Sequence, residues 1–171
     1  MSSYRHRLRP RARRARPLAS AGVAGLLLLA PACSSADDRA AAAVPSPGEE
    51  VTGLCRGLDE ALPETVVDKD RSDPEPESEL TAGWGSPAII LRCGIPRPAV
   101  MNDPDAAPVE VDGVGWVVEE LEGGAHRFTT SLRRAYVEVV LPAEVAAESG
   151  SFALVDLAPA ISGTIPRGVA D

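Results

Sequence analysis

The side chains whose positions most directly suggest chemistry are the three cysteines, Cys33, Cys55 and Cys93. Cys33 follows a long apolar run, whereas Cys55 and Cys93 lie in segments whose apolar residues recur at regular spacing. A thiol can form a disulfide, bind a metal or carry a covalent modification. Two cysteines without nearby histidines cannot supply the four ligands of a tetrahedral zinc site, so we expect no metal here.

The first 32 residues have the layout of a secretion signal. Residues 1–32 hold seven arginines and no acidic residue, and an apolar stretch runs from Leu18 to Ala30. A basic segment, an apolar segment and small residues before a cleavage point are typical of a signal peptide. About thirteen apolar residues are too few to span a bilayer, which needs roughly 20, although a permanent signal anchor is the alternative. Arg13-Arg14 lacks the bulky apolar residues that usually follow a twin-arginine export signal.

Cys33 stands where such a signal would end. The segment from Leu29 to Cys33 resembles the lipobox of bacterial lipoproteins, in which the cysteine is diacylated and becomes the new N-terminus. It departs from that pattern at Ala30, where leucine is usual, and at Pro31. We expect lipidation of Cys33; the alternative is ordinary cleavage and release, with an unpaired thiol. The polar, Pro- and Ala-rich residues 33–50 are predicted to form a disordered tether.

The other two cysteines are expected to form a disulfide. Apolar residues recur at helical spacing from Val51 to Leu62 and place Cys55 on the apolar face. Cys93 ends the run "AIILRC", where alternation places it on one strand face with Ile89 and Leu91. Both side chains therefore point into one helix–sheet interface, and an oxidising compartment would join them. Closing a loop of about 38 residues contributes roughly 4 kcal/mol.

The elements that position these cysteines predict an α+β domain over residues 51–167. Strands are expected in "SPAIILRCGI", on both sides of the Asp112-Gly113 turn, after Gly123-Gly124 and in "RAYVEVVLP". The segment "SFALVDLAPAISGTI" suggests a closing amphipathic helix that Pro159 breaks or kinks. We expect a small antiparallel sheet covered on one face by an N-terminal and a C-terminal helix.

Four motifs give the chain a resemblance to a known family. They are "CRGLDEALP", "WGSPAIILRCG", "VDGVGW" and "RRAYVEVVLP", which lie in this order between residues 51 and 142. They resemble an uncharacterised actinobacterial family of small exported or membrane-associated proteins, DUF3515. The resemblance implies an envelope location and supports the Cys55–Cys93 pairing, and it brings no activity. The loop before Trp84 is unusually acidic for the family.

That acidic loop places oxygens at positions 1, 3, 5 and 12 of a calcium-binding pattern, at Asp68, Asp70, Ser72 and Glu79. Asp73 stands where the EF-hand loop requires glycine, and prolines flank the next acid. We therefore expect a solvated acidic loop and no calcium site.

Other candidate groups have ordinary structural explanations. His126 has no "GxSxG" nucleophile near it in the sequence, so we expect an exposed hairpin histidine. Trp84 and Trp116 are suited to stacking on a sugar or peptide, but with so few aromatic residues we expect at least one in the core. Three arginines are expected to pair with carboxylates rather than with an anion: Arg92, Arg133 and Arg134.

The net charge and the predicted export signal limit the functions that the domain can have. The signal takes seven of the 17 basic residues and none of the 25 acidic ones, so the remainder has a net charge near −15. Such a domain repels nucleic acid and anionic lipid. We expect a lipid-anchored protein on the outer face of the cell membrane, a non-enzymatic binding or scaffolding accessory to an envelope protein or cell-wall component, without a cofactor. The alternative is a cell-wall enzyme or enzyme subunit that uses carboxylates in a cleft, such as Glu119, Glu120 or Glu138.

Overall fold

The helix that carries Cys55 ends where the sequence introduces a proline. In the computed structural model, which describes residues 39–106 and 108–170, α1 spans Glu49–Ala61. Leu62 leaves the helix with ψ of 143°, because the residue before a proline is sterically excluded from helical backbone. Cys55 and Leu58 are about 1% exposed and form its buried face.

Six antiparallel strands form the central sheet, in the spatial order β3-β4-β8-β7-β6-β5. The predicted turn at Asp112 and Gly113 joins β5 to β6, and both residues have positive φ, as a two-residue hairpin turn requires. A two-stranded hairpin, β1 with β2, precedes this sheet. The strands are β1 (Thr65–Val66), β2 (Lys69–Asp70), β3 (Thr81–Trp84), β4 (Ile89–Cys93), β5 (Pro108–Val111), β6 (Val114–Glu120), β7 (His126–Ser131) and β8 (Val137–Leu141).

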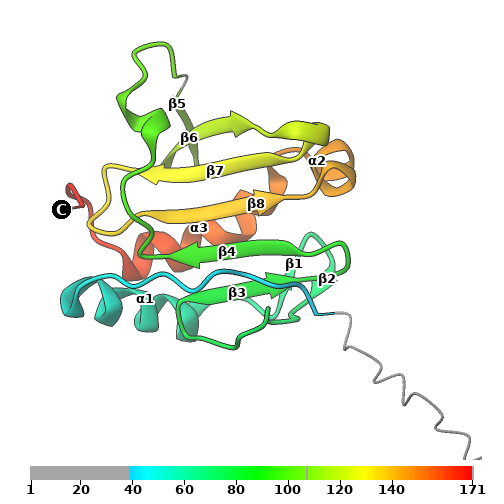
Figure 1. Ribbon diagram of the computed structural model, residues 1–171, viewed down its shortest axis with the longest axis horizontal. Helices are drawn as coiled ribbons and strands as arrows, with labels where there is room; N and C mark the ends of the chain where they lie inside the picture. The colour runs from blue at the N-terminus through cyan, green and yellow to red at the C-terminus, as the bar shows by residue number, and fades with distance from the viewer. Residues whose placement is uncertain (1–38, 107, 171) are drawn as a thin grey trace, which may run out of the picture. The chain divides into compact units, whose positions relative to one another are not determined.

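One face of this sheet is covered by helices. Alternate residues of β4 and β8 are buried on that face, where α1 and the C-terminal helix α3 (Phe152–Thr164) pack (Figure 1). The short helix α2 (Ala143–Ser149) and two 3-10 turns, Ala99–Asn102 and Glu122–Gly124, complete the fold. The prediction of an α+β domain, in which an N-terminal and a C-terminal helix cover one face of an antiparallel sheet, is confirmed.

Pro159 lies inside α3 and does not end it, so of the two effects expected from the sequence, a break or a kink, the break does not occur. Pro159 and Val155, whose carbonyl the proline leaves without an N–H donor, both lie on the exposed side of the helix. Water can therefore satisfy that carbonyl. The helix is also less amphipathic than predicted, because small side chains let it bury much of its circumference: Ala153, Leu154, Leu157, Ala158, Ala160 and Ile161.

The tether predicted for residues 33–50 is wrong from residue 39 onward. The Ala42 amide donates to the Glu75 carbonyl at 3.1 Å, and the Glu75 amide donates to the Ala40 carbonyl at 2.8 Å. Further on, Pro47 packs so closely on Gly94 that a Cβ at Gly94 would lie 2.6 Å from its ring. Residues 39–48 thus run along the domain before α1 begins (Figure 1). Residues 33–38 lie outside the described part of the chain.

Candidate functional site

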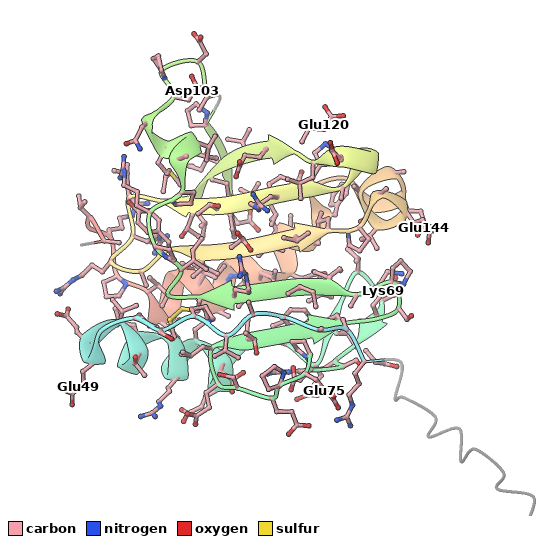
Figure 2. The ribbon with its side chains drawn as sticks, viewed as in Figure 1. Glu49, Lys69, Glu75, Asp103, Glu120 and Glu144 are labelled. Carbon is pink, nitrogen blue, oxygen red and sulfur yellow. A yellow bond between two sulfur atoms is a disulfide. The ribbon has the colours of Figure 1, made fainter. Side chains whose placement is uncertain are left out.

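A disulfide joins Cys55 of α1 to Cys93 at the end of β4. Their Cα atoms are 5.6 Å apart and both residues are about 1% exposed. Figure 2 shows the bond between the helix and the sheet. This is the pair that helix spacing and strand alternation predicted, and it fixes α1 against the covered face of the sheet. Cys33 and the predicted signal lie outside the described residues.

Within the residues that the structure describes, no helix is both long and apolar enough to cross a bilayer. The same residues contain no cluster of three or more His, Cys, Asp or Glu side chains arranged to hold a metal ion.

The sequence predicted a solvated acidic loop, but part of this loop packs around the guanidinium group of Arg71. Arg71 donates to carboxylate oxygens of Asp73, at 2.8 Å, and of Asp59 in α1, at 2.5 Å. Its guanidinium also lies over Trp84, 5.9 Å from the ring centroid. Burial opposes the charge, but the two carboxylates outweigh it and raise the pKa of Arg71. Of the calcium-pattern positions, Glu79 is paired with Arg56 at 2.8 Å.

Both tryptophans lie in the core and neither is available to stack on a ligand. Trp84 and Trp116 have no measurable exposure. The indole N–H of Trp84 donates to the Pro63 carbonyl at 3.0 Å, whereas that of Trp116 is buried without a partner among the described residues.

His126, expected to be exposed, is half-buried. Its ring stacks on Phe128 with the centroids 6.3 Å apart, and its Nδ1 atom is buried without a hydrogen bond to the described residues. The hairpin location was predicted correctly; the burial follows from the aromatic neighbour two residues along the same strand face.

The three glutamates considered as catalytic carboxylates do not converge on a cleft. Glu138 of β8 is buried between Arg92 of β4, at 2.8 Å, and Arg127 of β7, at 3.3 Å. Glu119 of β6 lies 3.6 Å from Arg127, so alternating charges cross four strands on the face opposite the helices. Glu120 points away from the sheet (Figure 2). We call Arg92, Glu138, Arg127 and Glu119 the charge ladder.

We predict that Glu138→Gln destabilises the domain by about 1–3 kcal/mol. The variant keeps the shape of the side chain but leaves two arginines without their shared carboxylate, and the cost is moderated because both arginines are partly exposed. Urea unfolding measures it, with Glu120→Gln as the matched control, for which we expect less than about 0.5 kcal/mol. Equal midpoints for the two variants would show that the ladder contributes nothing.

The three arginines expected to pair with carboxylates behave differently from one another. Arg92 pairs with Glu138, and Arg134 pairs with Glu50 of α1, as predicted. Arg133 does not: it is only 4% exposed and donates to two backbone carbonyls, those of Ile165 at 2.8 Å and Gly113 at 3.0 Å. The prediction of a carboxylate partner is wrong for Arg133, because the turn that carries it faces the end of α3.

A second arginine, which the sequence did not single out, stands beside Arg133. The backbones of Arg133 and Arg167 pair as an antiparallel bridge, and Arg167 reaches the same Gly113 carbonyl at 3.5 Å. Burial, and then repulsion from Arg167, lower the pKa of Arg133. The two side chains line a hollow together with Glu110, Gly115 and Ser131. We call this the arginine hollow.

A comparison with known protein families identifies the family of this chain. Residues 17–169 match a family described as a protein of unknown function, DUF3515. The chain belongs to the DUF3515 family. The match includes the disulfide, the charge ladder and the arginine hollow of this DUF3515 domain, and it begins at Pro17, directly before the apolar segment that precedes Cys33. No curated protein and no solved structure matches the chain.

Proposed function

We propose that this DUF3515 protein is an exported, lipid-anchored binding or scaffolding accessory of the cell envelope, held on the outer face of the membrane through Cys33. The observation that carries the proposal is the buried disulfide between α1 and β4. Structural disulfides persist in oxidising compartments and are rare in the cytosol. A core built around one therefore favours a destination outside the cytoplasm.

The N-terminal residues support the same destination. An arginine-rich segment, a short apolar run and a cysteine at its end form the order expected of a lipoprotein signal. The family match begins at residue 17, so the whole apolar run from Leu18 to Ala30 lies within the region that matches the family. Because a single acyl chain binds membranes only marginally, diacylation would provide the stable attachment.

The surface of the domain favours binding over catalysis. The glutamates best placed for acid–base chemistry, Glu119 and Glu138, are held in ion pairs of the charge ladder. An enzyme of this kind needs two titratable groups converging in a concave site. The arginine hollow instead offers fixed N–H donors, which suit recognition of a ligand.

Replacing Cys33 by serine tests the anchor. We expect the wild-type protein to take up labelled palmitate and to sediment with membranes, and the Cys33→Ser protein to lose the label and appear in the soluble fraction. Ser34→Ala is the matched control and should behave as the wild type. Palmitate incorporation into Cys33→Ser, or none into the wild type, would contradict lipidation at this cysteine.

A further inference from the structure

Uncompensated positive charge gathers at one end of an otherwise acidic domain. Four arginines lie there: Arg97, Arg133, Arg134 and Arg167. Arg134 pairs with Glu50, whereas among the described residues no carboxylate oxygen lies within 4.0 Å of the other three. Arg97 donates instead to the Tyr136 hydroxyl at 2.7 Å.

Arg133 is the most deeply buried of these charges, and the exposed Arg167 lies beside it. Both guanidinium groups donate to the one carbonyl oxygen of Gly113, so two like charges lie close together at this exposed turn. The other acceptor of Arg133, the Ile165 carbonyl, follows α3 and contributes only a fraction of a negative charge. A buried cation is costly unless a full opposite charge or several hydrogen bonds compensate it. The Glu110 carboxylate also lines the hollow but lies more than 4.0 Å from both guanidinium groups, so a bound anion would supply that compensation.

The hollow has the size of one small anionic group. Its volume is about 70 Å³. Gly115 keeps it open, because a Cβ at this position would lie 2.6 Å from the hydroxyl oxygen of Ser131. The Ser131 hydroxyl lines the wall beside the arginines and adds a hydrogen-bond donor.

An apolar hollow of about 210 Å³ adjoins it and shares Ser131, Leu132 and Arg133 with it. Leu132 lines both hollows, is 75% exposed and has φ of +53°, a left-handed conformation that strains a bulky residue. Val169, 70% exposed, also lines the apolar hollow. Strained backbone held by its surroundings is concentrated at binding sites and switches.

We propose that this end of the domain binds a ligand that carries a carboxylate or phosphate group next to an apolar part. The anionic group is held by Arg133 and Arg167 in the arginine hollow, and the apolar part packs on Leu132 and Val169. The proposal deepens the binding role proposed above by naming the chemical class of the ligand. It places the recognition of charge in fixed, pre-positioned guanidinium groups.

The position of the site favours a free ligand over the membrane itself. The turn that carries Leu132 lies beyond the Cys93 end of the sheet, whereas the described chain begins near Glu75, at the opposite side in Figure 1. The described chain therefore enters the domain at the end opposite to the arginine hollow.

Titration of the purified full-length protein, followed by amide NMR signals, tests the proposal without depending on export or acylation. The probes are hexanoate and hexyl phosphate, with hexylammonium as the charge control. We expect both anions to shift the amide signals of Gly113, Gly115 and Leu132, and hexylammonium to shift none of them. The anion that binds more tightly shows whether the ligand carries a carboxylate or a phosphate group.

Variants assign the binding to the named side chains. Arg167→Gln, at an exposed position, should weaken the binding of the more tightly bound anion about tenfold. Arg134 lies at the same end of the domain but pairs with Glu50, so Arg134→Gln should change this affinity less than about twofold. Leu132→Gly should weaken the binding of hexyl phosphate more than the binding of inorganic phosphate. Equal losses in the two arginine variants, equal binding of hexylammonium, or no shift at millimolar probe would overturn the proposal.

Discussion

A protein in which Cys55 and Cys93 are both replaced by alanine should melt roughly 10–20 °C below the wild type. The disulfide closes a loop of sequence separation 38, and in the chain-entropy model this is worth roughly 4 kcal/mol. Domains of this size have a total stability of about 5–15 kcal/mol, so the loss is a large share. Differential scanning calorimetry of the two purified proteins measures it.

Two controls separate the disulfide from other effects of losing cysteine. Reduced wild-type protein should melt close to the double variant, because both lack the cross-link. Cys33→Ser should melt within about 1 °C of the wild type, since we predict that this cysteine contributes to anchoring and not to the fold. A double variant that melts within a few degrees of the wild type would contradict a stabilising disulfide in this core.

Trp84→Ala should destabilise the domain by about 3–5 kcal/mol. The indole is fully buried, it donates to the Pro63 carbonyl, and it supports the guanidinium of Arg71. Its removal leaves a large cavity between β3 and the segment after α1, together with an unpaired carbonyl. Urea unfolding at constant m-value measures the change in the free energy of unfolding.

The two tryptophans provide a matched comparison that isolates the hydrogen bond. Trp84→Phe loses side-chain volume and the hydrogen bond to the Pro63 carbonyl. Trp116→Phe loses a similar volume, but the N–H that it removes has no hydrogen-bond partner among the described residues. We therefore expect Trp84→Phe to cost about 1 kcal/mol more than Trp116→Phe. The opposite order would show that packing, not the hydrogen bond, dominates at these positions.

Periodicity predicted the elements whose side chains alternate between core and surface. Cys55 and Cys93 could be paired in advance because helix spacing and strand alternation each define a buried face. The strand β3 was not predicted, since Thr81–Trp84 is short, contains Gly83 and is buried on both faces, which removes the alternation. A strand covered on both sides has no period-two signal to find.

Contacts between distant segments account for the errors. Residues 39–48 have the composition of a tether, yet their backbone pairs with Glu75, and no local pattern encodes that pairing. Arg133 stands beside Arg134 in the sequence, and only the fold places one in the protein interior and the other next to Glu50. Arg167 could not be predicted as part of the arginine hollow either, because its hydrogen-bond partner Gly113 is 54 residues away in the sequence.

The most direct test of the proposed exported, disulfide-linked lipoprotein is mass spectrometry of the native protein, extracted from the membranes of a bacterium that produces it and kept unreduced. We expect an intact chain that begins at Cys33, carries a diacylglyceryl group and lacks the two thiol hydrogens of Cys55 and Cys93. Proteolysis should release these two cysteines in one linked peptide pair. A chain that retains residues 1–32, without lipid and with free thiols at all three cysteines, would contradict the proposed function and the disulfide together.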